Sequence, residues 1–315
     1  MIEPPEQQVR SIEERMGPEL YARRRAIETG PRRMRGSANN WRERLMLRWQ
    51  PHGLLRLLLK SAFLWNRGYR NFLNLRVVEV MVQLPRLPVA FDGFRILQLT
   101  DLHLDLAPEL IPVIRKRLSG IGYDLVVITG DFKNRVAPPA EAAIALTQSL
   151  LPSLRPPMLA TLGNHDTLAL VEPLEASGLR FLLNESITLR RDNATLVLAG
   201  VDDSYMFRTD DIGRALEGVP EDSCKILLSH APTNYEQAAA AGVDYFICGH
   251  THGGQICWSK RHAIIPSGGV PAQLIVGRWK QAAMQGYTSR GTGACHVPIR
   301  FNFPGEITVH VLKTT

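Results

Sequence analysis

Five short apolar runs recur between residues 94 and 248, and each stops at acidic, amide or imidazole side chains. The runs are 94-FRILQLT-100, 124-DLVVIT-129, 157-PMLATL-162, 225-KILLS-229 and 243-VDYFIC-248. Runs of this length predict strands, and near-continuous apolar strands suit a sheet that is covered on both faces. Helical patterns between them, such as 140-AEAAIALTQSLL-151, indicate crossover connections. The sequence therefore predicts an α/β fold with a largely parallel sheet.

The polar residues that follow these runs are expected to lie close together. In open α/β sheets, reactive groups collect beyond the carboxyl ends of the strands. The residues at these ends are Asp101, His103, Asp131, Asn164, His165, His230, His250 and His252. Aspartate, neutral imidazole and amide oxygen are ligands of divalent cations, whereas a structural zinc site more often contains cysteines. The set is too large for one ion and suits two, which could together hold a phosphoryl group and activate a water.

The motifs differ in how specific they are. A lone D-x-H or G-D after a strand is usually only a turn. The run 163-GNHD-166 is more specific, because it buries no apolar surface and each polar member can bind metal or transfer a proton, and 249-GHTH-252 is more specific still. Isolated histidines are interpreted as surface or core residues. These are His52, His262, His296 and His310.

Taken together, the motifs resemble the full signature of the calcineurin-like metallophosphoesterases over residues 92–313. The matching blocks are Asp101-x-His103, Gly130-Asp131, Gly163-Asn164-His165-Asp166, His230 and Gly249-His250-Thr251-His252. The extension GHTHGGQI and the segment 287–312 resemble a bacterial subgroup that is often membrane-associated and includes UDP-2,3-diacylglucosamine pyrophosphate hydrolases of lipid A synthesis. The resemblance implies a four-layer α/β/β/α sandwich at residues 91–315, preceded by a basic helical extension at residues 1–90.

The resemblance also implies roles for individual residues. One ion would be bound by Asp101, His103 and His252, the other by Asn164, His230 and His250, with Asp131 bridging the two. His165 would stabilise the transition state or protonate the leaving oxygen, and Asp166 would hold the ring of His165 in the right tautomer. Manganese is the expected metal, and zinc, iron and magnesium also tolerate this mixture of ligands.

The positive charge of the chain is concentrated in its first 90 residues. The formal net charge is +7, yet residues 1–90 hold 17 Lys and Arg against 8 Asp and Glu, a net charge of +9, and the remainder holds 20 against 22. This part contains 23-RRR-25, 32-RRMR-35 and 54-LLRLLLKSAFLWNRGYRNFLNLR-76. Charges interrupt the last run too often for a transmembrane helix or a secretory signal.

A basic helix with an apolar face is therefore predicted within residues 54–76. Such a helix either lies in an anionic membrane surface or packs its leucines on the main domain, and the pattern alone favours neither. Nucleic acid is not expected as a partner, because no recognition motif accompanies the basic segment.

The cysteines indicate the compartment. Cys224, Cys248, Cys257 and Cys295 are scattered without C-x-x-C spacing, which is typical of reduced thiols. The sequence thus predicts a cytoplasmic protein, peripheral on the cytoplasmic face of the inner membrane if the basic helix binds lipid.

Three functional hypotheses follow, and the intact set of metal ligands argues against one of them, a scaffold that kept the fold and lost activity. The leading one is a dinuclear-metal phosphohydrolase that cleaves a phosphoester or pyrophosphate bond of a nucleotide-linked lipid such as UDP-2,3-diacylglucosamine. The alternative is a soluble phosphodiesterase or phosphomonoesterase that acts on nucleotides or small phosphoesters. The segment 202–220 bears on the choice, because Tyr205, Met206 and Phe207 would form an apolar wall for acyl chains if they lined the mouth of the site.

Overall fold

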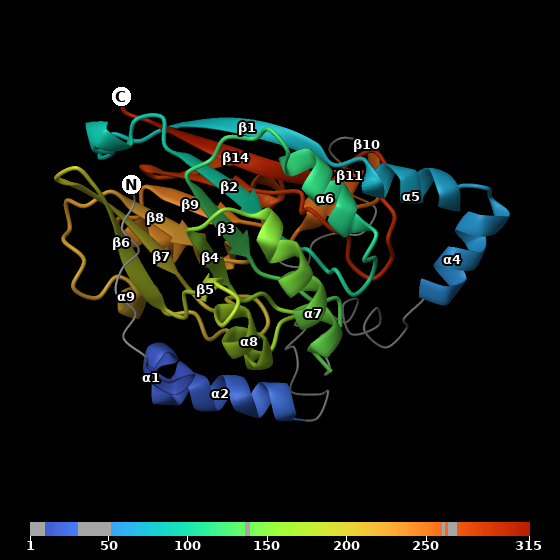
Figure 1. Cartoon of the computed structure of the whole chain (residues 1–315), viewed down its shortest axis with the longest axis horizontal. Coiled ribbons are helices and arrows are strands. Elements are labelled where there is room, and N and C mark those ends of the chain that lie inside the picture. Colours follow the sequence, from blue (N-terminus) through green and yellow to red (C-terminus); the bar gives the residue numbers. More distant parts are fainter. Residues whose placement is uncertain (1–9, 31–51, 136–138, 260–261, 264–269) are drawn as a thin grey trace.

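The fold consists of two six-stranded sheets stacked face to face, with helices on their outer faces (Figure 1). The computed structural model describes residues 10–30, 52–135, 139–259, 262–263 and 270–315. The α-helices are α1 (Ile12–Met16), α2 (Pro18–Thr29), α4 (His52–Ser61), α5 (Trp65–Leu73), α6 (Leu110–Leu118), α7 (Glu141–Leu150), α8 (Val171–Glu175), α9 (Ile212–Ala215) and α10 (Tyr235–Ala240). The arrangement is the predicted α/β/β/α sandwich.

The first sheet has the strand order β1-β14-β2-β3-β4-β5. Its strands are β1 (Arg76–Gln83), β2 (Arg95–Leu99), β3 (Leu125–Thr129), β4 (Met158–Thr161), β5 (Arg180–Phe181) and β14 (Glu306–Lys313). The pairs from β2 to β5 are parallel, β14 is antiparallel to β2, and β1 is parallel to β14. The predicted strands at 94–100, 124–129 and 157–162 are therefore confirmed as adjacent parallel strands.

The second sheet has the strand order β12-β13-β9-β8-β7-β6. Its strands are β6 (Glu185–Arg191), β7 (Ala194–Gly200), β8 (Lys225–Leu228), β9 (Tyr245–Cys248), β12 (Gly277–Gln281) and β13 (Met284–Thr288). The central strands β7, β8, β9 and β13 run parallel, and antiparallel hairpins close both edges. A short ribbon of β10 (Cys257–Ser259) and β11 (His262–Ala263) lies apart from both sheets.

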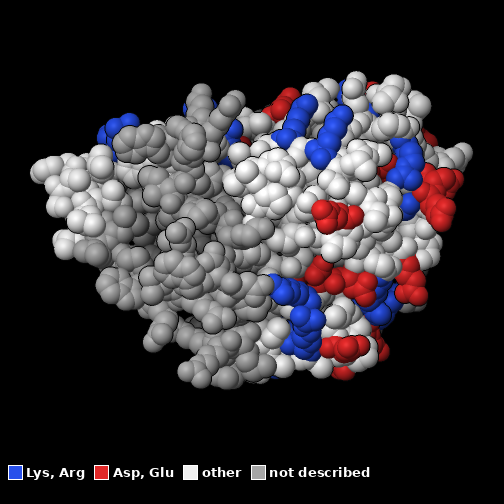
Figure 2. Space-filling view, turned by 180° about the vertical axis from the view of Figure 1, so that it is seen from behind, with Lys and Arg blue, Asp and Glu red and all other residues white. Residues whose placement is uncertain are grey.

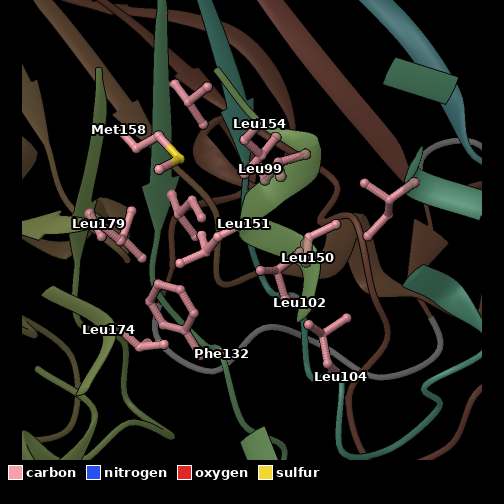
Figure 3. Packing of buried hydrophobic residues seen from close by; sticks show 14 of the residues in the cluster. Leu99, Leu102, Leu104, Phe132, Leu150, Leu151, Leu154, Met158, Leu174 and Leu179 are labelled. Carbon is pink, nitrogen blue, oxygen red and sulfur yellow. The ribbon is translucent and has the colours of Figure 1, made fainter. Parts of the chain in front are cut away.

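Alternate residues of the central strands enter different core layers, as the period of two in a strand requires. In β3, Leu125 and Val127 pack between the two sheets, whereas Val126 and Ile128 pack under the outer helices. Figure 3 shows this outer layer, in which Leu99 of β2 and Met158 of β4 lie among leucines from α7 and α8. A third core cluster lies between the second sheet and helices α9 and α10. Burial on both faces explains why these strands are largely apolar.

The first sheet begins before the predicted domain boundary at residue 90/91. β1 lies inside the segment that the sequence assigned to the N-terminal extension, and it pairs with β14 over its whole length, from Arg76 with Glu306 to Gln83 with Lys313. One face of β1 buries Val80 and Val82, while Val77 and Met81 are exposed on the other. A boundary at residue 90 would separate an edge strand from its sheet, so the extension cannot include residues 76–90.

The basic run 54–76 also differs from the single helix that its sequence predicts. It forms α4 and α5, separated by residues 62–64, and ends at the first residue of β1. The break places Phe63 at a positive φ of 54°, and its side chain is 91% exposed. The basic motif at residues 32–35 lies outside the described residues. Among the described residues, no helix combines the length and the apolar character needed to cross a membrane.

Candidate metal centre

The predicted ligands gather where the strands of both sheets end. Asp101 and His103 follow β2, Asp131 follows β3, Asn164 follows β4, His230 follows β8, and His250 and His252 follow β9. Several of them have the left-handed backbone that non-glycine residues rarely adopt, with φ of 52° at Asp101, 42° at His103, 58° at Asp131, 72° at His250 and 52° at His252. Such strained turns persist where the surrounding structure enforces them and are concentrated at functional sites.

The first group of side chains surrounds the Nε2 atoms of His103 and His252, which lie 3.3 Å apart. His252 Nε2 lies 3.3 Å from Asp101 Oδ1, and His103 Nε2 lies 3.5 Å from Asp131 Oδ2. The other ring nitrogen of His103, Nδ1, donates to the carbonyl oxygen of Lys133 at 2.8 Å. That bond leaves the unprotonated Nε2 of a neutral His103 pointing at Asp131 and His252, as a metal ligand requires.

The second group centres on the side-chain oxygen of Asn164. Asn164 Oδ1 lies 3.0 Å from His230 Nε2 and 2.8 Å from His250 Nδ1. His230 Nδ1 donates to the carbonyl oxygen of Thr129 at 2.8 Å, which directs Nε2 of this buried ring at the same point. The three side chains predicted to share an ion thus face one another.

Asp131 connects the two groups. Its Oδ2 lies 3.5 Å from His103 Nε2 and 3.3 Å from His230 Nε2, so one carboxylate oxygen stands between an imidazole of each predicted ion. The other oxygen, Oδ1, accepts a hydrogen bond from the backbone N–H of His165 at 2.9 Å, which fixes the carboxylate. This position is the one that a bridging ligand needs.

Burial controls the protonation of these histidines. Burial lowers the pKa of His103 to about 3 and that of His250 to about 3, which keeps both rings neutral. Burial also acts against charge on His230, but the neighbouring Asp131 carboxylate outweighs it and raises the pKa of His230 to about 10. Without a metal, a proton on His230 neutralises the Asp131 carboxylate, and a divalent cation would replace that proton.

The residues fit a pair of divalent cations. The converging atoms are imidazole nitrogens, carboxylate oxygens and an amide oxygen, all from side chains no more than 7% exposed except the half-buried His250. Asp101, Asp131 and His230 also have ligand atoms within 4.8 Å of one another, as do His103, Asp131 and His165. Imidazole nitrogens and carboxylate and amide oxygens held this close together are a suitable binding site for Mn²⁺, Zn²⁺, Fe²⁺ or Mg²⁺.

His165 lies beside the predicted metal ligands and is 9% exposed. Its ring is 5.0 Å from the ring of His103, edge to face, and its Nδ1 donates to the carbonyl oxygen of Asn134 at 2.6 Å. That hydrogen bond places the proton of a neutral ring on Nδ1. The tautomer of His165 is therefore set by a backbone carbonyl from the loop after β3.

Asp166 does not hold the ring of His165, so the predicted contact between them is wrong. The Asp166 carboxylate accepts from the backbone N–H groups of Asp131 at 2.7 Å, Phe132 at 2.9 Å and Gly163 at 2.8 Å. The turn at residues 163–166, in which the Asp166 N–H donates to the carbonyl oxygen of Gly163, directs the carboxylate away from the His165 ring and toward the loop after β3. Asp166 joins the turns that carry Asp131 and Asn164.

Two glycines are required because side chains approach their backbone closely. A Cβ atom at Gly163 would lie 2.2 Å from Asp131 Oδ1, and one at Gly249 would lie 2.2 Å from Thr100 Oγ1 and 2.4 Å from Asp101 Oδ2. The glycines of the GNHD and GHTH motifs thus leave room for the carboxylates of the metal centre.

The C-terminal segment 287–312 contributes residues to the site that the sequence did not identify. The buried Arg300 donates to the carbonyl oxygens of His252 at 3.1 Å and Gly293 at 2.6 Å, which fixes the turn that carries His252. Cys295 Sγ lies 3.7 Å from His165 Nε2. His296, which sequence reasoning set aside, has its ring 5.9 Å from that of His165. No local pattern could have predicted the contacts with His165 and His252, because they join residues more than 40 positions apart.

His310, which its isolation in the sequence predicts to be a surface or core residue, is buried in the core. It lies between the sheets, where Nδ1 accepts from the hydroxyl of Tyr245 at 2.7 Å and Nε2 donates to Gln98 Oε1 at 3.0 Å. Both polar atoms of its ring are therefore paired. The cysteines are free thiols, as predicted, and Cys295 is the least buried of them.

The predicted apolar wall in residues 202–220 is only partly formed. Phe207 is 1% exposed and packs beneath Arg24, whose guanidinium carbon lies 3.5 Å from the ring centroid. Phe207 therefore cannot contact an acyl chain. Tyr205 packs on His250 with ring centroids 4.2 Å apart, which places an aromatic ring beside the second group of ligands.

Comparison with known proteins gives consistent matches. Residues 94–254 match the family model of calcineurin-like phosphoesterases. The uncharacterized metallophosphoesterase YkuE of Bacillus subtilis is 30% identical over 263 residues, which cover 79% of this chain and 90% of YkuE. YkoQ of the same organism, also an uncharacterized metallophosphoesterase, is 29% identical over 81% of this chain and 97% of its own length. The phosphodiesterase YaeI of Escherichia coli is 25% identical over 69% of this chain and 81% of its own length.

Proposed function

Since the chain belongs to the calcineurin-like phosphoesterase family and is thus a metal-dependent phosphohydrolase, we propose that it cleaves a phosphoester or pyrophosphate bond in a nucleotide-linked membrane lipid, such as UDP-2,3-diacylglucosamine. The family and the ligand chemistry support the reaction class. The lipid substrate and the membrane surface are supported by the position and side chains of α4 and α5.

A bound pair of divalent ions would activate a water molecule and neutralise the charge on the phosphoryl oxygens. The residues of the chain supply the rest. Asp131 spans the two groups of ligands and sets their separation. His165, with the proton of its neutral ring on Nδ1, has Nε2 3.7 Å from Cys295 Sγ beside the ligand groups, where it would stabilise the developing charge or, once protonated, donate to the leaving oxygen. Asp166 holds the turns of Asp131 and Gly163 together by accepting hydrogen bonds from their backbone N–H groups.

The observation that carries the lipid proposal is the surface of α4 and α5. Their apolar side chains are unusually exposed, with fractions of 64% at Leu57, 55% at Leu58, 91% at Phe63 and 39% at Leu64. Basic residues surround them, namely Arg56, Lys60, Arg67 and Arg70, all exposed. Uncharged residues protrude at this end of the molecule with Lys and Arg side chains beside them (Figure 2). Apolar residues among cations suit a bilayer with anionic head groups.

This surface is connected to the metal centre through α5. The carbonyl oxygen of Gly68 accepts a hydrogen bond from the backbone N–H of Arg300 at 3.0 Å, and a Cβ atom at Gly68 would lie 2.8 Å from the ring of Phe301. Arg300 in turn holds the turn of His252. A membrane contact at α4 and α5 would therefore bring lipid head groups toward the side of the molecule that carries the metal ligands.

The test compares the hydrolysis of UDP-2,3-diacylglucosamine in phosphatidylglycerol vesicles with that of bis-p-nitrophenyl phosphate, each with manganese-loaded protein and with His165→Ala as the blank. We expect rapid, His165-dependent cleavage of the lipid. The double variant Leu58→Ser with Phe63→Ser should lower the ratio of lipid turnover to diester turnover and weaken vesicle binding. Val89→Ser is the matched control, because Val89 is 82% exposed but lies away from α4 and α5.

Two results would contradict the proposal. Cleavage of the small diester without cleavage of the lipid nucleotide would leave the phosphohydrolase but remove the lipid substrate. The alternative would then hold, in which the protein is a phosphodiesterase or phosphomonoesterase that acts on nucleotides or small phosphoesters. In that case the ring of Tyr205, which packs on His250, would be a place for a nucleotide base to stack. Equal vesicle binding by the double variant and Val89→Ser would remove the role of α4 and α5.

A further inference from the structure

Cys295 points its thiol into the predicted metal centre. Its Sγ atom lies 3.7 Å from His165 Nε2, and it forms a group with His103 and His252 whose ligand atoms all lie within 4.8 Å of one another. Its backbone is fixed on both sides by Gln255, which accepts from the N–H of Cys295 at 2.8 Å and donates to its carbonyl oxygen at 3.1 Å. These two hydrogen bonds fix the backbone of Cys295 and so restrict the positions that its thiol can take.

The two histidines of this group provide a second observation, because their Nε2 atoms converge on the point that Cys295 borders. His103 is 1% exposed, and because its Nδ1 donates to Lys133, the Nε2 of the neutral ring is a buried lone pair. That lone pair faces Nε2 of His252 at 3.3 Å, where one proton at most can lie between the two nitrogens. A cation bound by both nitrogens would take the place of that proton, and the thiol of Cys295 borders the same point.

We propose that Cys295 is an additional, sulfur ligand of the ion predicted at Asp101, His103 and His252. The inference rests on the proposed function only in taking that metal centre as its site. Zinc bonds are about 2.0–2.1 Å to nitrogen and about 2.3 Å to sulfur, so two ligands of one ion lie within about 4.4 Å. The ligand atoms of Cys295, His103 and His252 lie up to 4.8 Å apart, so the half-buried side chain of Cys295 needs to move only slightly inward to bind the same ion.

A thiolate at this position would make the two metal positions chemically different. Soft sulfur ligands favour zinc and iron, whereas carboxylate, amide and water oxygens suit manganese and magnesium. The ion bound by Asn164, His230 and His250 has only nitrogen and oxygen ligands in the described structure. The position beside Cys295 would therefore select zinc or iron even where manganese occupies the other.

X-ray absorption at the zinc edge tests the proposal. We expect the zinc-loaded wild-type protein to show scattering from sulfur at about 2.3 Å, and we expect Cys295→Ser to lose it while keeping two bound ions. Cys257→Ser is the matched control, because Cys257 is a buried thiol of the neighbouring loop that contacts the carbonyl oxygen of Gly253. It should keep the sulfur signal.

Metal competition gives a second readout that does not depend on turnover. Cys295→Ser should lower the preference of one site for zinc over manganese by at least about tenfold. Bound zinc surrounded only by nitrogen and oxygen in the wild-type protein would overturn the proposal and leave the metal centre intact. Failure of the wild-type protein to bind zinc or manganese would overturn this proposal and the proposed function together.

Discussion

The guanidinium of Arg24 donates to Asp202 Oδ1 at 2.9 Å, and both side chains are completely buried. Arg24 also donates to the carbonyl oxygen of Asp166 at 3.0 Å and to Glu28 Oε1 at 3.0 Å. Helix α2 is thereby fixed to the loops that follow β4 and β7. The described part of the N-terminal segment that precedes α4 is thus an integral part of the main domain.

Replacing Arg24 by leucine should lower the free energy of unfolding by about 3–5 kcal/mol, because Asp202 would remain as a buried charge without its partner. The measurement is urea unfolding at pH 7.5. Arg25→Leu is the control, since the Arg25 side chain is 50% exposed, and should change stability by less than about 0.5 kcal/mol. Equal effects of the two substitutions would show that the buried ion pair does not stabilise the fold.

Asp166→Asn should destabilise the protein by at least about 2 kcal/mol and weaken metal binding. Its carboxylate accepts from the N–H groups of Asp131, Phe132 and Gly163, and an amide NH₂ would face some of these donors. Thermal unfolding with and without metal, together with metal titration, measures both effects. Normal stability and metal binding with lost turnover would instead show that Asp166 takes part directly in catalysis.

Gly249→Ala should weaken metal binding by at least about tenfold, comparable to the loss of one charge-assisted hydrogen bond. The added methyl group would lie 2.4 Å from Asp101 Oδ2 and displace that carboxylate. Isothermal titration with manganese is the measurement. Gly122→Ala is the control, since a Cβ atom there has no neighbour within 4 Å. Unchanged affinity in Gly249→Ala would exclude Asp101 as a ligand.

His310 should make the fold less stable as the pH falls below about 6.5. Burial lowers the pKa of His310 to about 3 in the folded state, so between these values the unfolded chain binds a proton that the folded chain does not. The contribution is present above pH 6.5 and declines at up to about 1.4 kcal/mol per pH unit as the pH falls toward 3.

Urea unfolding of wild type and His310→Asn at pH 7.5 and 5.5 isolates this effect. The wild-type protein should lose more stability than the variant between the two pH values, because asparagine retains hydrogen bonding and does not titrate. An equal loss in both proteins would mean that His310 does not contribute to the pH dependence.

The sequence predicts the central strands and the meeting of the ligand residues for the same physical reason. A strand buried on both faces is largely apolar up to its carboxyl end, so clustered polar residues mark the loop that follows, as at Asp101 after β2 and Asp131 after β3. Parallel neighbours then bring those ends together. The specific roles of the ligands carried over from the family remain predictions.

Contacts made from distant loops could not be predicted in this way. Asp166 follows His165 directly, yet the two side chains diverge, because the turn sends the carboxylate to the N–H groups of the β3 loop. Cys295 and Arg300 belong to an irregular segment whose path is set by α5 and β14 packing around it. The sequence does not indicate the start of β1, because this edge strand is half exposed and begins with Arg76, which continues the basic run before it.

The position of β14 also imposes an order of events on biosynthesis. β14 is the last strand along the chain, but in the sheet it lies between β1 and β2, which are among the first to be made. Until residues 306–313 have been made, β1 has no neighbouring strand in the sheet, because β14 is its only partner there. The loop that carries Cys295 and Arg300 can be fixed only after that strand has inserted. A chain that lacks residues 306–313 would therefore lose the contacts of Glu306 with Gly291 and Thr292 that hold the start of this loop.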